Sequence, residues 1–260
     1  MIYLNLCGMN EIRPCLSSDR KASPMSSVNR GTIALAGAGE YLPKMNPVDQ
    51  YLLEQLKETP RVAILPTAAA PDGGGVPERW NDLGVEHFTR LGATVEPLML
   101  LTREDANNPM FVEKLAFANF IYFSGGKPSY LLETLKDTAA WRVIQQVYAR
   151  GGVIAGCSAG AMVLGAVLFD FPQFWRTIPA LGLIPGIAVI PHFDEIPKPM
   201  TSTVAKIGRN KFTVVGVDGA TALVVSDGRW TVQGTGAVTV ISEKQKHRYQ
   251  AWAEVPPVEV

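Results

Sequence analysis

The five residues 156–160 (GCSAG) combine residue types and a spacing that suit nucleophilic catalysis. They fit the pattern G-x-S-x-G, with the short apolar run Val153–Ala155 before them and a helix-like stretch from Ala159 after them. A sharp turn between a strand and a helix strains the backbone and lifts the central side chain clear of the sheet. The first N–H groups of the helix then favour negative charge that develops nearby. We therefore predict that Ser158 is a nucleophile.

Two other interpretations of this segment stay open. A tight crossover rich in glycine and alanine can serve packing alone, without any chemistry. Cys157 is a second nucleophilic side chain in the motif. The glycines flank Ser158 symmetrically, however, and Cys157 stands one place before the apex of the turn.

A catalytic serine needs a base, and the chain has three histidines. His192 follows the apolar run Ile187–Ile190, and open α/β sheets place their sites at the carboxyl ends of strands. His87 falls in an amphipathic stretch, and His247 falls in the charged segment 243–248. We therefore predict His192 as the general base, with a purely structural role as the alternative.

A glycine-rich loop follows another apolar run, Phe120–Phe123, and precedes a helical stretch. Its two glycines let a backbone N–H approach a substrate oxygen closely, so the loop is expected to supply half of an oxyanion hole. A simple glycine turn is the alternative. Gly37-Ala-Gly39 begins like a dinucleotide-binding loop, but Leu42 stands where the third glycine belongs, so no NAD site is predicted.

The composition excludes several classes of protein. With 260 residues, 47% of them hydrophobic, the chain can bury a sizeable core. Lys+Arg and Asp+Glu both number 24, so neither a nucleic acid nor an anionic membrane is expected as a partner. The cysteines (Cys7, Cys15, Cys157) have no zinc-site spacing and cannot form a disulfide framework. We expect no metal, no cofactor and a reducing, cytoplasmic compartment.

The longest uncharged run, residues 151–169, is long enough on paper to cross a bilayer, and a second uncharged run covers residues 177–193. The first contains five glycines and the second contains three prolines, so we predict no membrane span. The N-terminus has no basic region ahead of an apolar core and is not a secretory signal. Residues 1–30 are predicted to be a polar, poorly ordered leader.

From Thr32 onward, short β-branched runs alternate with longer amphipathic stretches. This alternation, with strands that are apolar throughout, predicts a parallel sheet covered by helices on both faces. The predicted strands are Thr32–Ala36, Arg61–Leu65, Thr94–Met99, Phe120–Phe123 and Val153–Ala155, and the predicted helices are Pro47–Lys57, Val76–Leu91, Asn108–Ala118, Pro128–Leu135 and Ala139–Arg150, with another from Ala159.

The last third of the chain changes character. After Ile187–Ile190 and a helical stretch over Lys198–Gly208, short strands predominate, and Asp227-Gly228 is a hairpin signal. We predict an antiparallel C-terminal edge on a mostly parallel sheet, within one α/β domain over residues 31–245, followed by a C-terminal tail over 246–260. These short strands are Phe212–Val217, Thr221–Ser226, Arg229–Gln233 and Val238–Ser242.

Taken in order, four segments resemble peptidase family S51, which includes aspartyl dipeptidase (peptidase E) and cyanophycinase. They are residues 121–126 (IYFSGG), 155–161 (AGCSAGA), 190–193 (IPHF) and 215–223 (VGVDGATAL), and the resemblance spans about 31–242. It implies the class I glutamine amidotransferase-like fold, a flavodoxin-like α/β/α sandwich, and a serine-type peptidase. It also implies Ser158 as the nucleophile, His192 as the general base, and the N–H groups of Gly126 and Ala159 as the oxyanion hole.

The residue that orients the histidine is where the sequence departs from this family. In cyanophycinase-like members an acidic residue stands at the position that matches Gly219 here. Asp218 is our choice for the role, Asp194 is the alternative, and an incomplete triad is the third option. The two residues before His192 are closer to the dipeptidase pattern than to the cyanophycinase pattern. The resemblance thus implies a dipeptidase or exopeptidase for short peptides, with Asp-containing peptides among the candidates.

Two other functions are considered. Gly219 motivates a non-catalytic binding or regulatory member of the same fold. An α/β-hydrolase-type esterase would use Ser158, Asp218 and His247, which occur in the chain order of that class. Against the esterase, His247 lies in a charged segment and no HGGG-type loop precedes the turn. A small peptide is the expected partner, and a homodimer is considered without a sequence signal that decides it.

Overall fold

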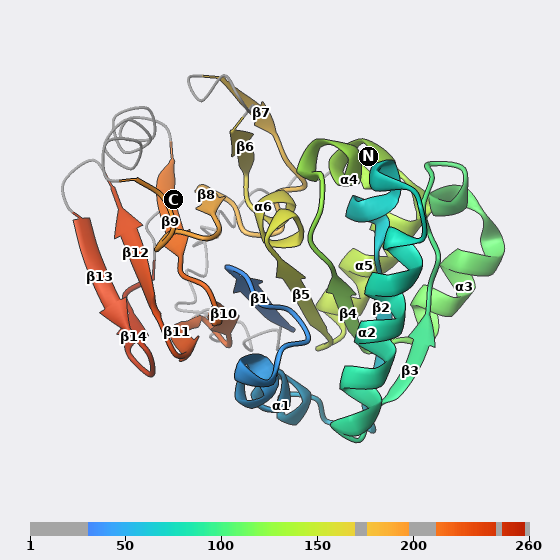
Figure 1. Cartoon of the computed structure of the whole chain (residues 1–260), viewed down its shortest axis with the longest axis horizontal. Helices are drawn as coiled ribbons and strands as arrows, with labels where there is room; N and C mark the ends of the chain where they lie inside the picture. Colours follow the sequence, from blue (N-terminus) through green and yellow to red (C-terminus); the bar gives the residue numbers. More distant parts are fainter. Residues whose placement is uncertain (1–30, 170–175, 198–211, 243–245, 258–260) are drawn as a thin grey trace, which may run out of the picture.

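The computed structural model describes residues 31–169, 176–197, 212–242 and 246–257, which form two β-sheets and the helices that flank the larger one (Figure 1). The predicted leader and the predicted helix Lys198–Gly208 lie outside these ranges. The larger sheet has eight strands in the order β14-β11-β10-β1-β5-β4-β2-β3. These strands are β1 (Thr32–Ala36), β2 (Arg61–Leu65), β3 (Thr94–Pro97), β4 (Phe120–Phe123), β5 (Val153–Cys157), β10 (Thr221–Ser226), β11 (Arg229–Gly234) and β14 (Glu254–Val255).

Five neighbouring strands of this sheet run parallel to one another. β1 pairs with β5, β5 with β4, β4 with β2, and β2 with β3. Every residue of β1, β4 and β5 is buried. A strand covered on both faces needs apolar side chains throughout, which explains the continuous apolar runs in the sequence. The predicted parallel sheet is confirmed.

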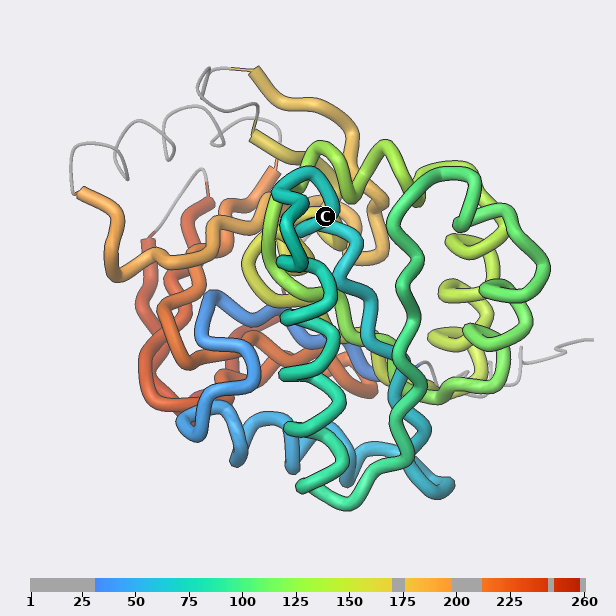
Figure 2. The backbone as a smooth tube through the Cα atoms, turned by 45° about the vertical axis from the view of Figure 1, so that its right-hand side comes forward, coloured from blue at the N-terminus to red at the C-terminus, as the bar shows by residue number. Residues whose placement is uncertain are grey.

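Helices cover both faces of the larger sheet, as Figures 1 and 2 show. On one face, α1 and α2 bury Val48, Leu52 and Phe88 against side chains such as Ile64 and Tyr122. On the other face, α3 to α6 pack with alternate strand residues. None of the described helices has the length and apolar character needed to cross a membrane. The helices are α1 (Asn46–Glu54), α2 (Val76–Arg90), α3 (Pro109–Phe117), α4 (Pro128–Leu135), α5 (Ala139–Ala149) and α6 (Ala159–Leu164), with short 3₁₀ helices η1 (Pro43–Met45), η2 (Thr67–Asp72) and η3 (Asp105–Asn107).

The remaining strands of the larger sheet form the predicted antiparallel C-terminal edge. β10 pairs with β1, β11 with β10, and β14 with β11, all antiparallel. The turn between β10 and β11 is the predicted hairpin, with Asp227 at φ 49° and Gly228 at φ 76°. Two residues of positive φ match the twist of the strands on either side.

A second sheet of six strands, in the order β13-β12-β9-β8-β6-β7, was not predicted. The strands that correspond to β9 and β12 were expected at the edge of the larger sheet, but β9 pairs with β8 and β12. The predicted arrangement of one sheet is therefore incomplete. The strands of this second sheet are β6 (Val167–Phe169), β7 (Thr177–Pro179), β8 (Ile187–Ile190), β9 (Thr213–Val217), β12 (Ala237–Ile241) and β13 (Lys246–Gln250).

The residues predicted as a C-terminal tail belong to both sheets. β13 pairs with β12 over five residues, and β14 pairs with β11. Most residues of β13 are exposed, so its sequence lacks the apolar alternation that identifies a half-buried strand. Backbone pairing holds β13 in place, and the buried side chain of Val255 anchors β14 in the main core.

Candidate active site

Ser158 stands at the turn between β5 and α6, where the sequence predicts it. Its backbone angles are φ 51° and ψ −111°, a conformation that residues with a side chain rarely adopt. Hydrogen bonds hold the turn on both sides, because the Ser158 N–H donates to the Ala36 carbonyl (3.0 Å) and its carbonyl accepts from Met162 (3.1 Å). The surrounding structure thus fixes a strained residue at the carboxyl edge of the sheet.

The two glycines of the motif let strand and helix approach closely. A Cβ atom at position 156 would lie 2.4 Å from the carbonyl of Gly160. A Cβ atom at Gly160 would lie 2.5 Å from the carbonyl oxygen of Phe123. Both separations are shorter than van der Waals contact allows, so the turn requires glycine at each position.

His192 lies just beyond the end of β8 and faces the serine. Its Nε2 atom is 3.2 Å from the Oγ atom of Ser158, within hydrogen-bond reach. The His192 backbone also has a positive φ of 51°. The Phe193 N–H fixes the loop by donating to the Val217 carbonyl at 3.0 Å. The structure therefore brings together the two residues predicted as nucleophile and base.

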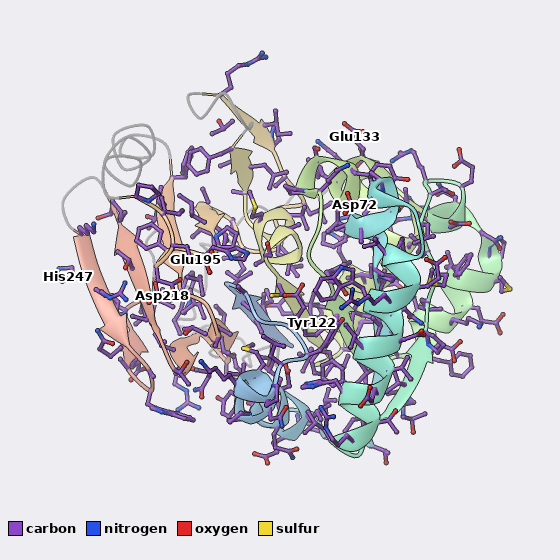
Figure 3. The ribbon with its side chains drawn as sticks, viewed as in Figure 1. Asp72, Tyr122, Glu133, Glu195, Asp218 and His247 are labelled. Atoms are coloured by element: carbon purple, nitrogen blue, oxygen red, sulfur yellow. The ribbon has the colours of Figure 1, made fainter. Side chains whose placement is uncertain are left out.

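Asp218, our choice for the residue that orients His192, directs its carboxylate elsewhere. The carboxylate forms an ion pair with Arg248 of β13 and accepts a hydrogen bond from the Ala237 N–H at 3.0 Å. None of the described contacts joins it to His192. In Figure 3, Asp218 is labelled beside the strands of the second sheet. These contacts link β9 to β12 and β13.

The alternative carboxylate, Asp194, supports the histidine loop from another side. Its Oδ1 atom accepts a hydrogen bond from the Gly219 N–H at 2.8 Å. A Cβ atom at Gly219 would lie 3.7 Å from the same carboxylate. Asp194 therefore faces Gly219, the position that the resemblance to cyanophycinase-like members matches to their acid, but it binds the backbone there and has no described contact with the imidazole.

Glu195 carries the carboxylate that faces the free edge of the imidazole. Its Oε2 atom lies 3.5 Å from the Nδ1 atom of His192. The Glu195 side chain is 68% exposed, so water competes for this interaction. Glu195 was not among the predicted site residues. The signal that could have identified it is its place three residues after His192.

The two N–H groups predicted for the oxyanion hole belong to the loop after β4 and to the start of α6. Ala159 is the first residue of α6, so its N–H has no acceptor within the helix. Gly126 has φ 141°, and a Cβ atom there would lie 2.3 Å from the carbonyl oxygen of Ala68. Within the part of the chain that the structure describes, the Gly126 N–H donates no hydrogen bond. Their role as an oxyanion hole stays a prediction.

The other two histidines lie elsewhere. His87 is buried in α2, where its Nε2 atom is 2.8 Å from Oδ2 of Asp49. His247 belongs to β13 at the outer edge of the second sheet (Figure 3). Neither has a described contact with Ser158, so the constellation of an esterase with His247 as base is not assembled.

Two buried residues below the turn complete the site. Cys157 is fully buried, and its Sγ atom donates to Oε2 of Glu40 at 2.9 Å. Burial and the nearby Glu40 carboxylate raise the pKa of the Cys157 thiol well above its ordinary value. A protonated, inaccessible thiol is a poor nucleophile, which favours Ser158 over Cys157. Sequence reasoning missed Glu40, because its partners are 85 and 117 residues away along the chain.

The fold and the site define an α/β protein with a serine–histidine pair at the carboxyl edge of a parallel sheet. A family model described as peptidase family S51 matches residues 33–233. The chain therefore belongs to peptidase family S51, and its class is that of a peptidase, a hydrolase. The resemblance found in the sequence is confirmed.

Individual relatives agree with this assignment. The chain is 28% identical over 201 residues to the uncharacterized peptidase YgaJ of Bacillus subtilis (strain 168), covering 75% of this chain and 83% of that protein. A crystal structure of a peptidase from an acI-B1 Actinobacterium is 35% identical, with a TM-score of 0.80 and coverage of 88% and 98% of the two chains. A putative peptidase E protein from Listeria monocytogenes EGD-e, 19% identical with a TM-score of 0.56 over 80% of this chain and all of that one, shares the fold.

Proposed function

We propose that the protein is a serine-type peptidase that hydrolyses short peptides as a dipeptidase or exopeptidase. The observation that carries the proposal is the 3.2 Å separation between His192 Nε2 and Ser158 Oγ at a strained turn. Ser158 is the nucleophile and His192 the general base in this proposal. The N–H groups of Gly126 and Ala159 stabilise the oxyanion.

The proposed reaction has two steps. The Ser158 oxygen attacks the peptide carbonyl while His192 accepts its proton, and negative charge develops on the carbonyl oxygen between the two N–H groups. His192 then gives the proton to the leaving amine as the C–N bond breaks. Water, deprotonated by His192, attacks the acyl-enzyme in the same way, releases the acid and restores Ser158.

A dipeptide library tests the proposal. The wild type is expected to hydrolyse a subset of dipeptides, and Ser158→Ala is expected to lose this activity, because removal of a triad nucleophile costs on the order of 10⁶ in kcat in a well-characterised serine protease. Asp-containing dipeptides are included in the library because the family includes aspartyl dipeptidase. Equal hydrolysis by the wild type and Ser158→Ala would reject Ser158 as the nucleophile.

The non-catalytic alternative gives a different result in a labelling experiment. A fluorophosphonate probe forms a covalent bond to the Ser158 oxygen with loss of fluoride only if the serine is activated. Labelling of the wild type with none in Ser158→Ala supports a catalytic protein. His192→Ala should abolish labelling whereas His247→Ala should retain it, because His192 contacts the serine and His247 lies on the edge strand β13.

A further inference from the structure

We propose that the turn 39–41, after β1, positions the oxyanion loop 124–126 against Ser158, with Glu40 as its principal positioning residue. This inference rests on the proposed function and adds residues that do not touch the substrate. The turn lies more than 80 residues before either loop that it contacts. Its role is to fix the geometry of both oxyanion N–H groups at once.

One carboxylate connects both halves of the site. Glu40 Oε1 accepts the Gly125 N–H at 2.9 Å, and Oε2 accepts the Cys157 thiol at 2.9 Å. Gly125 directly precedes Gly126, and Cys157 directly precedes Ser158. Glu40 thereby links the residue before each part of the catalytic machinery, from a buried position.

The space between Glu40 and the serine is filled by the loop itself. A Cβ atom at Gly125 would lie 2.7 Å from Oε1 of Glu40 and 3.4 Å from the Cβ atom of Ser158. The peptide at Gly125 therefore lies between the carboxylate and the nucleophile. Without the carboxylate, the buried Gly125 N–H would lose its acceptor, and the loop would shift to find another.

The neighbouring residue, Tyr41, holds the loop one position earlier. Its hydroxyl is 2.8 Å from the Oγ atom of Ser124, and both residues are buried. The Tyr41 ring packs against buried aromatic rings, including Phe88 and Tyr122, with centroids 6.3 and 5.2 Å away. The core therefore anchors the turn that binds the loop.

The backbone of the turn is strained. Tyr41 has φ 64° although it carries a large side chain, and Gly39 has φ 89°. Such a conformation is unfavourable by itself and persists only where the surroundings enforce it. Consecutive side chains that reach Ser124, Gly125 and Cys157 give a physical reason for this strain.

The test compares Glu40→Met, which keeps the length of the side chain but removes both acceptor oxygens, with wild type by the rate of fluorophosphonate labelling at Ser158 and by kcat and KM on a hydrolysed dipeptide. We expect labelling and kcat to fall about 10- to 100-fold, because loss of one oxyanion donor costs about 10²–10³ and a misplaced loop loses part of that. KM should change less than about threefold, because ground-state binding does not use the oxyanion hole.

Asp49→Asn is the matched control, because Asp49 is also a buried carboxylate but contacts His87. This variant should lose thermal stability while its labelling rate stays within about threefold of wild type. A folded Glu40→Met that is labelled at the wild-type rate overturns the inference, as does an equal loss of labelling in folded Asp49→Asn. If Glu40→Met does not fold, Tyr41→Phe decides, since it removes one hydroxyl: slower labelling supports the inference and wild-type labelling overturns it.

Failure of the proposed function gives a separate result. A wild type that is not labelled at Ser158 overturns the proposed function. The proposed role of the turn is then rejected as well, because it depends on that function. A labelled wild type beside an equally labelled Glu40→Met overturns only the role of the turn.

Discussion

Ser158 and His192 both have positive φ angles of 51°, although neither is glycine. Strain at two contacting residues indicates that neighbouring parts of the structure hold them in place. For Ser158 these are the hydrogen bonds to Ala36 and Met162, and for His192 the bond between Phe193 and Val217. The pair is thus set in position by the ends of four strands, β1, β5, β8 and β9.

Asp218→Asn separates a structural role from a catalytic one. We expect it to lower the free energy of unfolding by about 1.5–3 kcal/mol, because it weakens buried, charge-assisted hydrogen bonds to Arg248 and Ala237. We expect kcat to stay within about threefold of wild type, far from the roughly 10⁴-fold loss that follows amidation of a triad aspartate. Urea unfolding and dipeptide kinetics measure the two effects.

Glu195→Gln is the companion variant at the same histidine. An exposed carboxylate contributes at most about 1 kcal/mol, so turnover should fall by less than about fivefold. A loss near 10⁴-fold in Asp218→Asn would restore Asp218 to the triad. Unchanged turnover in both variants would point to water or a backbone carbonyl as the orienting group.

At the scale of elements, the strands and turns that depend on local sequence patterns could be predicted. The parallel strands and the turn at Ser158 follow from apolar runs punctuated by glycine, and these signals lie within a few residues. The second sheet escaped prediction because β6 and β7 have three residues each and β13 is mostly exposed. The contacts of Glu40 and of Asp218 join residues that are far apart in the sequence. No short-range sequence pattern predicts them.

A chain ended at residue 245 tests the contribution of the last two strands. The truncation removes Arg248. The Asp218 carboxylate, which is 4% exposed, thereby loses its ion-pair partner. The truncation also uncovers the edges of β12 and β11. We expect the free energy of unfolding to fall by about 2 kcal/mol or more and the truncated chain to self-associate. Denaturant unfolding and light scattering measure these effects; unchanged stability would show that residues 246–257 are dispensable.

At the scale of the whole molecule, a buried polar cluster lies between the active-site turn and the helices α1 and α2. It includes Glu40, Tyr41, Tyr122 and Cys157. Burial raises the pKa of Tyr41 and Tyr122 above 10 and, with Glu40, raises that of the Cys157 thiol above 9. The folded chain therefore keeps protons that the unfolded chain releases in alkaline solution.

The sign of the resulting pH dependence follows from these shifts. Each group that is ionised in the unfolded chain but protonated in the folded chain lowers the free energy of unfolding by about 1.4 kcal/mol per pH unit. We expect stability to fall as pH rises through about 9, where the unfolded thiol ionises, and more steeply through about 10, where the tyrosines follow. Urea unfolding at half-unit intervals from about pH 7.5 to 10.5 measures the curve.

Cys157→Ala isolates the thiol within this curve. Its difference in unfolding free energy from wild type should be constant below about pH 8 and should shrink above about pH 9, because only the wild type then loses stability through Cys157. Tyr122→Phe serves as the second comparison, since the buried Tyr122 hydroxyl has no hydrogen-bond partner among the described residues and its removal should be neutral or stabilising at pH 7. A difference between wild type and Cys157→Ala that stays constant to about pH 10.5 would mean that the thiol ionises as readily in the folded chain as in the unfolded one, and that its bond to Glu40 does not hold the proton.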